Sequence, residues 1–230
     1  MKMISPSILV VLLAAAPAVL GAATFEGKVH LKISDNKGQS HEMVQSLKDG
    51  LVRTDVEAGV HSASLIMDFA KQELTILIAA QHMYMVRPMP TGAPAGAPGA
   101  ADTGEASFAK TGETEKILGY DCVKYVAKTK DGAHEVWVTD QLGRFGGLGG
   151  GNPMARRHGG KPTAGWEQLL AGKDLFPLRV VTHNAAGTET FRLEAVSVEK
   201  TTLPASDFQP PADYKKLDMG GMMPGTMPGH

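Results

Sequence analysis

The chain has 230 residues, a formal net charge of −1 and 20% charged residues. The charge is near neutral and the sequence has no stripe of basic residues, so nucleic-acid binding is excluded as a function class. Roughly 200 residues would remain after removal of an export leader, a length that suits one domain with a substantial core.

The N-terminal residues have the pattern of a secretory signal peptide. Lys2 precedes an unbroken apolar run from Ile8 to Ala16. Pro17 interrupts the apolar character before it reaches the roughly 20 residues that span a bilayer. Ala23 stands where a bacterial lipoprotein would carry its cysteine. We therefore predict a signal peptide at residues 1–22 and a periplasmic or secreted mature protein, soluble and without a transmembrane segment.

Cys122 is the single cysteine of the chain, so the sequence provides no intramolecular disulfide. Cysteine is among the most often buried residue types, and we expect a packing role for Cys122. The core alone must then hold the exported domain together.

The N-terminal half is typical of short β-strands. Apolar residues alternate with polar ones from Phe25 to Ile33, which predicts a half-buried strand at residues 24–34. Similar segments predict strands at 39–47, 51–56, 63–69, 73–79 and 82–87, with a hairpin signal at Lys48-Asp49-Gly50. The two most apolar segments, 63–69 and 73–79, are expected at the centre of the sheet. Such a succession of short strands predicts an antiparallel meander.

Residues 88–104 consist mainly of proline, alanine, glycine and threonine. Such a segment cannot bury enough apolar surface to offset the entropy of ordering it, so a flexible loop within one domain is expected.

The segment Lys110 to Asp140 predicts a turn followed by a β-hairpin. Its strands are expected at 120–129 and 134–139, joined by a turn at Asp131-Gly132. In this pairing Trp137 comes close to the strand that carries Tyr125.

The C-terminal third begins with a glycine-rich loop at 143–162, which has neither spacing of a phosphate-binding loop. A short helix is predicted at 163–171, because Trp166, Leu169 and Leu170 share one helical face. Strands are predicted at 178–183 and 188–200, and an extended segment at 203–214 is expected to be pinned across the sheet by Phe208 and Tyr214. The tail at 217–230 has no periodicity and is predicted to be disordered.

The predicted fold class is mainly β (α+β), with one curved antiparallel sheet and one or two short helices over its concave face, in a single domain at 23–216. That face can be filled by the protein itself, or it can hold an apolar guest. The residues expected to line such a ligand cavity are Leu65, Met67, Leu74, Ile76, Met83, Met85, Trp137 and Phe145. The alternative is that these residues form ordinary core.

Catalytic signatures are missing from the sequence. It has no GxSxG or HExxH motif, and its eight histidines are scattered. Glu113 and Glu115 are two residues apart, but a solvated turn explains them better than catalysis. We expect a non-enzymatic protein without a cofactor.

Copper binding is an alternative, because thioether sulfur is a soft ligand for Cu(I). The tail offers Met219, Met222, Met223, Met227 and His230, and one strand offers His82, Met83, Met85 and Met89. Methionine also fills cores, and a tail rich in glycine and proline can be a linker.

The sequence resembles an uncharacterised bacterial family, domain of unknown function 4412. The most specific block is Thr111 to Tyr125 (TGETEKILGYDCVKY). Weaker matches are Phe25-Glu26-Gly27, Arg53 with Asp55, Asp68, Trp137-Val138-Thr139, Leu142-Gly143 with Phe145, Phe176-Pro177-Leu178, and Phe208 with Tyr214. That family is similar to the periplasmic lipoprotein carriers and their outer-membrane receptor (LolA/LolB-like). The resemblance implies a curved antiparallel half-barrel, capped by helices over an apolar cavity, and implies no catalytic residues.

Together, these features predict an exported binding or carrier protein for an apolar ligand or a lipidated partner in the cell envelope. A lipid or a lipoprotein is the expected partner. A copper-binding accessory protein that uses the methionine-rich tail is the alternative, and a structural envelope protein without a small ligand is a third hypothesis.

Overall fold

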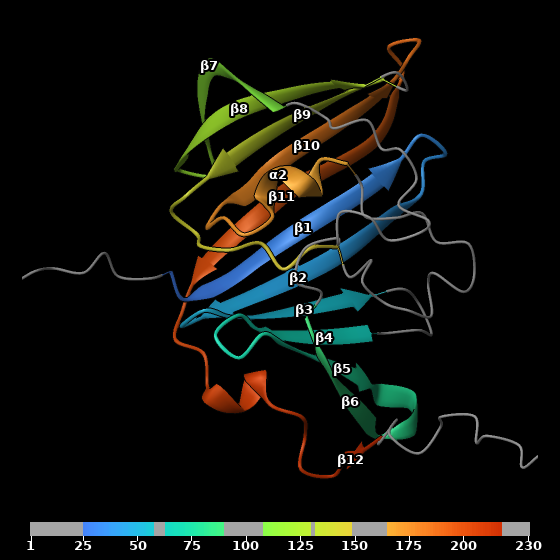
Figure 1. Ribbon diagram of the computed structural model, residues 1–230, viewed down its shortest axis with the longest axis vertical. Helices are drawn as coiled ribbons and strands as arrows, with labels where there is room; N and C mark the ends of the chain where they lie inside the picture. Colours follow the sequence, from blue (N-terminus) through green and yellow to red (C-terminus); the bar gives the residue numbers. More distant parts are fainter. Residues whose placement is uncertain (1–24, 58–62, 90–107, 130–131, 149–164, 218–230) are drawn as a thin grey trace, which may run out of the picture.

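The structure, a computed structural model, describes residues 25–57, 63–89, 108–129, 132–148 and 165–217. Within these ranges, twelve strands form one curved sheet in the order β12-β6-β5-β4-β3-β2-β1-β11-β10-β9-β8-β7 (Figure 1). The strands are β1 (Gly27–Asp35), β2 (Ser40–Lys48), β3 (Leu51–Glu57), β4 (Ala63–Asp68), β5 (Glu73–Ile78), β6 (Met83–Pro88), β7 (Phe108–Ile117), β8 (Tyr120–Thr129), β9 (Gly132–Thr139), β10 (Phe176–Asn184), β11 (Glu189–Lys200) and β12 (Lys215–Lys216).

The sheet is built from two antiparallel meanders. Each strand from β1 to β5 pairs with the next strand in sequence, and so does each strand from β7 to β10. Antiparallel pairing of β1 with β11 joins the two meanders, whereas β12 adds to β6 in parallel. The expected antiparallel meander is confirmed, and its predicted turn at Asp49-Gly50 has the positive φ angles, 49° and 78°, of a tight hairpin.

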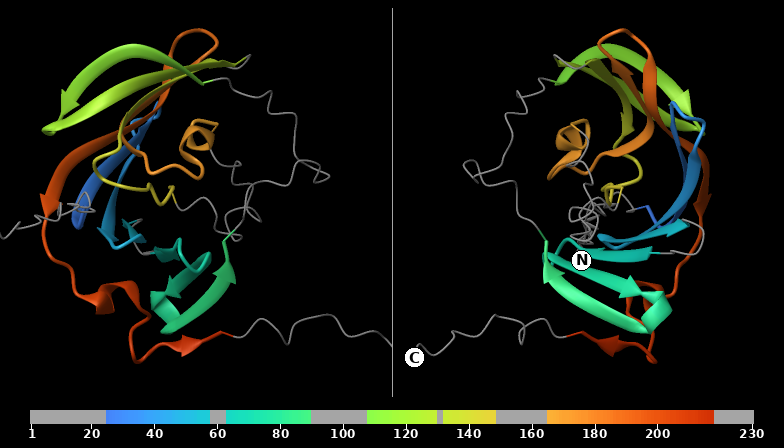
Figure 2. Two further views of the ribbon diagram at one scale, coloured as in Figure 1. Left: turned by 60° about the vertical axis from the view of Figure 1, so that its left-hand side comes forward. Right: turned by 90° about the vertical axis from the view of Figure 1, so that its right-hand side faces the viewer.

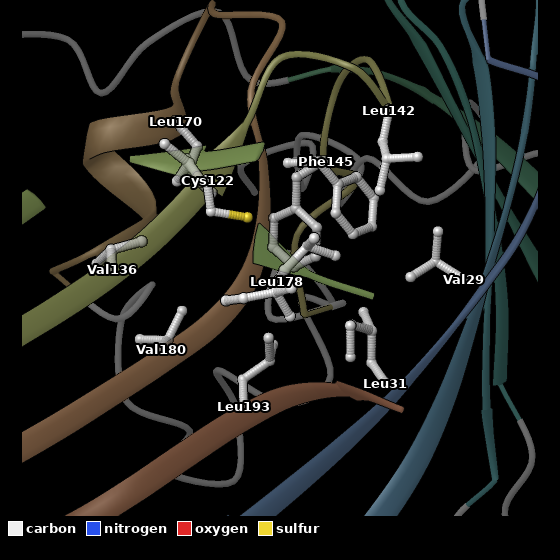
Figure 3. Close-up of a cluster of buried hydrophobic side chains, with 14 of the residues drawn as sticks. Val29, Leu31, Cys122, Val136, Leu142, Phe145, Leu170, Leu178, Val180 and Leu193 are labelled. Atoms are coloured by element: carbon white, nitrogen blue, oxygen red, sulfur yellow. The ribbon is translucent and has the colours of Figure 1, made fainter. Parts of the chain in front are cut away.

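The curvature of the sheet gives it a concave face, which both views of Figure 2 show from the side. The alternation predicted for β1 is confirmed there, because Val29 and Leu31 are fully buried. Figure 3 shows them with Cys122, Val136, Leu142, Phe145, Leu170, Leu178, Val180 and Leu193, which belong to one buried cluster. Cys122 is 1% exposed, so its expected packing role is also confirmed.

The convex face of β4 and β5 is covered by the C-terminal segment 203–217. Leu203 and Phe208 pack on Ile66 and Leu77, with the 3₁₀ helix η2 (Ala205–Phe208) between β11 and β12. Tyr214 packs against this cluster, so the expected pinning of the segment by Phe208 and Tyr214 is confirmed. The prediction that β4 and β5 lie at the sheet centre is wrong, because β2 and β1 occupy the middle of the strand order.

The turn predicted at the start of the segment 110–140 is wrong, because residues 111–113 belong to the edge strand β7. Most of β7 is exposed, and its register with β8 shifts between Lys110 and Thr114. A strand that is exposed and irregular in this way has no apolar alternation from which a strand could be recognised.

Helices contribute little to the described ranges. The 3₁₀ helix η1 (Ala79–Gln81) precedes β6, and the helix predicted at 163–171 is described as the single turn α2 (Glu167–Leu170). Figure 2 places α2 on the concave side, where Trp166, Leu169 and Leu170 are buried. Since α2 has only 4 residues, the expected helical cover of this face is not confirmed. None of the helices in the described ranges has the length and apolar character that a membrane span requires.

Several predictions concern residues outside the described ranges. They are the signal peptide at 1–22, nearly all of the loop at 88–104, most of the glycine-rich loop at 143–162 and all but the first residue of the tail at 217–230.

Candidate ligand-binding pocket

A pocket of about 700 Å³ lies at the end of the sheet where β2 turns into β3. We call it the end pocket. Its walls also include the turn after β4 and the segment that follows β9. The lining residues are Phe25, Leu47, Lys48, Gly50, Leu51, Val52, Phe69, Ala70, Asp140, Gln141, Gly143, Arg144 and Asp174. Its volume lies within the range of about 300–1,000 Å³ that is common for small-molecule sites.

The apolar wall of the end pocket is an extension of the main core. Leu47 and Val52 are opposite each other in the pairing of β2 with β3, and both are buried. Phe25 belongs to the same buried cluster, and Phe69 packs against that cluster. The wall is therefore held in place by the sheet, which favours a pocket that exists before a ligand arrives.

Lys48 forms one side of the polar rim. Its Nζ donates hydrogen bonds to Glu26 Oε1 at 2.6 Å and to the carbonyl of Leu203 at 2.7 Å. The bond from Lys48 and a second bond from the backbone N–H of Leu203 hold the pKa of the Glu26 carboxyl below its ordinary value of 4.5. Lys48 thus fastens the start of β1 and the C-terminal segment to the end of β2.

Arg144 forms the other side of the polar rim. Its Nε and Nη2 donate to Asp174 Oδ1 at 3.1 and 2.9 Å. Its Cζ also lies 4.6 Å from the centroid of the Phe69 ring, a cation–π distance. The guanidinium is therefore positioned by an apolar ring and by a carboxylate.

The segment 143–148 is attached to the concave face by Gln45. The Gln45 side chain is fully buried, donates to the carbonyl of Gly147 at 2.9 Å, and accepts from the N–H of Gly146 at 3.1 Å. A Cβ at position 146 would lie 2.7 Å from Val52 Cγ1 and 2.8 Å from Met67 Cε. Close approach of the backbone therefore requires glycine at 146, and it brings Arg144 to the pocket.

Most of the predicted cavity residues lie together on the concave face of β4, β5 and β6. Leu65, Ile76 and Met85 are cross-strand neighbours, and Met67 is opposite Leu74. Met83 is opposite Ile78, on the same face. Leu65, Met67 and Ile76 are buried, whereas Leu74, Met83 and Met85 are half-buried. None of these residues lines the end pocket.

Phe145 and Trp137 occupy different places from these six. Phe145 is buried, with its ring 5.9 Å from Trp166 and 5.4 Å from Phe176, and so fills the core. The prediction that Trp137 lines the cavity is wrong. Val136 and Val138 are buried on the concave face, and Trp137 points to the convex face, where Lys124 Nζ lies 5.6 Å from its ring.

The copper hypothesis stays a prediction, because Met219, Met222, Met223, Met227 and His230 lie outside the described ranges. In the part that is described, no three His, Cys, Asp or Glu side chains form a group that could hold a metal ion. His82 Nδ1 lies 2.7 Å from Asp213 Oδ2. The side chains of Met83 and Met85 belong to the concave face.

The sequence alone did not predict the end pocket, because its lining comes from turns and loops far apart in the chain. The hairpin signal at residues 48–50 and the apolar pair at 51–52 were the available indications. Nothing in the sequence indicated that Arg144 and Asp174 would lie beside the β4–β5 turn.

A family model described as "Domain of unknown function (DUF4412)" matches residues 25–214. No curated protein matches the chain. Among solved structures, PNGF-II is 16% identical with a TM-score of 0.49, and the match covers 85% of this chain and 31% of that one. The chain thus spans about a third of PNGF-II. The Pseudomonas aeruginosa MucA/MucB complex contains a chain that is 14% identical with a TM-score of 0.42, covering 82% of this chain and 56% of that one. A LolA superfamily protein from Nitrosomonas europaea is 11% identical with a TM-score of 0.33, covering 82% of this chain and 90% of that one.

Proposed function

Since the chain belongs to the family described as domain of unknown function (DUF4412), a description that assigns no activity, we propose its function from the end pocket. The protein is a non-enzymatic binding or carrier protein for an apolar ligand, or for the lipid part of a lipidated partner. It acts in the cell envelope, as the N-terminal leader pattern favours.

The observation that carries this proposal is the composition of the pocket wall. Phe25, Leu47 and Val52 form an apolar surface continuous with the core, and polar residues such as Lys48 and Arg144 line the pocket beside it. Apolar walls with a few fixed polar groups are the usual form of a site for an apolar or amphiphilic molecule. Burial of apolar ligand surface would contribute about 25 cal/mol per Å² before the cost of association is subtracted.

The chemistry of the lining favours binding over catalysis. The described residues that line the pocket include no histidine, serine or cysteine. A Ser–His or Cys–His pair, one usual starting point of covalent catalysis, is therefore missing from the described part of this wall. Cys122 lies in the core, where burial raises the pKa of its thiol.

The proposal is tested by titration with the fluorescent apolar probe N-phenyl-1-naphthylamine. Ala70 lines the pocket and is itself exposed, so Ala70→Trp fills the pocket from its rim without disturbing the core. We expect this variant to bind the probe about tenfold more weakly, equivalent to about 1.4 kcal/mol.

Ala186→Trp is the matched control, because Ala186 is exposed in the β10–β11 turn and does not line the pocket. Absence of probe binding to the wild-type protein, or an equal affinity in both tryptophan variants, would contradict the proposed function. Native mass spectrometry of the protein purified from its own envelope provides a second readout, since a carrier should retain a lipid.

A further inference from the structure

We propose that the ligand of the end pocket carries an acidic head group on an acyl chain, and that Arg144 binds this group. The inference rests on the proposed function and narrows its ligand class to amphiphiles with a carboxylate or a phosphate.

The guanidinium of Arg144 lies over the ring of Phe69, which holds it in place. Its Cζ lies 4.6 Å from the centroid of Phe69, and both residues line the pocket. Stacking fixes the plane of a guanidinium and leaves its edge free to donate hydrogen bonds. The Arg144 side chain is 29% exposed, so it lies at the boundary between the apolar wall and solvent.

The present partner of Arg144 is easily replaced. Asp174 is 74% exposed, and a single carboxylate oxygen, Oδ1, accepts the bonds from both Nε and Nη2. Pairs between exposed groups contribute little to stability, and a released Asp174 would be solvated by water. A ligand carboxylate or phosphate can instead pair with the fork of the guanidinium through two parallel hydrogen bonds.

Of the two cationic side chains that line the pocket, Lys48 and Arg144, Arg144 is the one that can pair with an acidic ligand. Lys48 is committed to Glu26 and to the carbonyl of Leu203, and its side chain is only 20% exposed. Asp140 also lines the pocket and is exposed, so it would repel an acid that bound beside it. The acidic group is therefore directed to Arg144, with the acyl chain on the apolar wall.

The test measures displacement of N-phenyl-1-naphthylamine by dodecanoate, dodecyl phosphate and dodecanol, each below its micelle concentration. We expect at least one acid to bind the wild-type protein about tenfold more tightly than the alcohol does. Preference for dodecanoate would indicate a free fatty acid as the source, and preference for dodecyl phosphate would indicate a phospholipid head group.

Arg144→Gln should abolish the difference between the affinities for acid and for alcohol. Asp174→Asn should strengthen binding of the acid, because it removes the competing carboxylate. Arg192→Gln is the matched control: Arg192 donates to Glu189 through the same two nitrogens, at 2.9 and 2.7 Å, and does not line the end pocket.

An acid-to-alcohol preference that survives Arg144→Gln would overturn the inference, and so would a wild-type protein without such a preference. In either case continued binding of the probe would leave the proposed function intact. If the probe does not bind at all, the proposed function itself fails. Thermal unfolding of each variant shows whether a loss of preference comes from loss of folding.

Discussion

Replacing Gln45 by methionine is expected to release segment 143–148 from the concave face and to destabilise the protein. Gln45 is fully buried, and its amide is bonded to the N–H of Gly146 and the carbonyl of Gly147. Methionine fills a similar volume but bonds neither group. Each unsatisfied buried polar group costs about 1–3 kcal/mol. Because both glycines are only half-buried, water recovers part of this cost, and we expect a loss of about 2–4 kcal/mol.

Urea denaturation measures this loss, with the fluorescence of Trp166 and Trp137 as the signal. At about 2–4 °C per kcal/mol, thermal unfolding should show a corresponding decrease of Tm. Gln39→Met is the control, because residue 39 is exposed. If Gln45→Met unfolds within about 0.5 kcal/mol of the control, the attachment of this segment does not depend on the Gln45 amide.

Three further predictions concern the same end of the molecule and the core beside it. Gly27→Ala should lower the free energy of unfolding, measured by urea denaturation, by about 3 kcal/mol or more, because an added Cβ would overlap the Glu199 carbonyl oxygen of the neighbouring strand. An unfolding midpoint equal to that of the wild type would refute this prediction. Since the folded-state pKa of Glu26 is lowered, its stabilising contribution is present above the unfolded value near 4.5 and is lost as pH falls through the folded value. Wild-type protein should therefore lose more stability on acidification than Glu26→Gln, and parallel pH profiles would contradict this. Cys122, 1% exposed and with a raised thiol pKa, should react with dithionitrobenzoate in urea but not in the folded protein, and prompt labelling of the folded protein would show that the thiol is accessible.

The strands were predictable where burial is one-sided. β1 alternates because one face contacts the core and the other contacts solvent, and the predicted strand at 120–129 matches β8. The position of β4 and β5 in the sheet was not predictable in the same way. Their apolar residues on both faces suggested a central position, but Ile66 and Leu77 are covered by the distant C-terminal segment instead. Periodicity shows that a face is buried and does not show which segment buries it.

The correct face for Trp137 could have been predicted from the local sequence. In the sequence HEVWVT, Val136 and Val138 share one face of the strand, and Trp137 must then lie on the other. The direction of its Cβ is set by the pleat of the strand. The Arg144–Asp174 pair is a different case, because a contact between two loops depends on where the strands end in space.

The residues that carry the family resemblance mostly hold the frame together. Arg53 is bidentate to Asp55 and also donates to the carbonyl of Asp207 at 2.9 Å, which fixes the C-terminal segment beside Phe208. This network lies on the convex face, away from the end pocket. Arg144, although it stands between the matched Gly143 and Phe145, is not among the residues that carry the resemblance, and neither is its partner Asp174. Membership of the family therefore argues for the curved sheet and its C-terminal cover, whereas the choice of head group in this chain depends on the rim of the pocket.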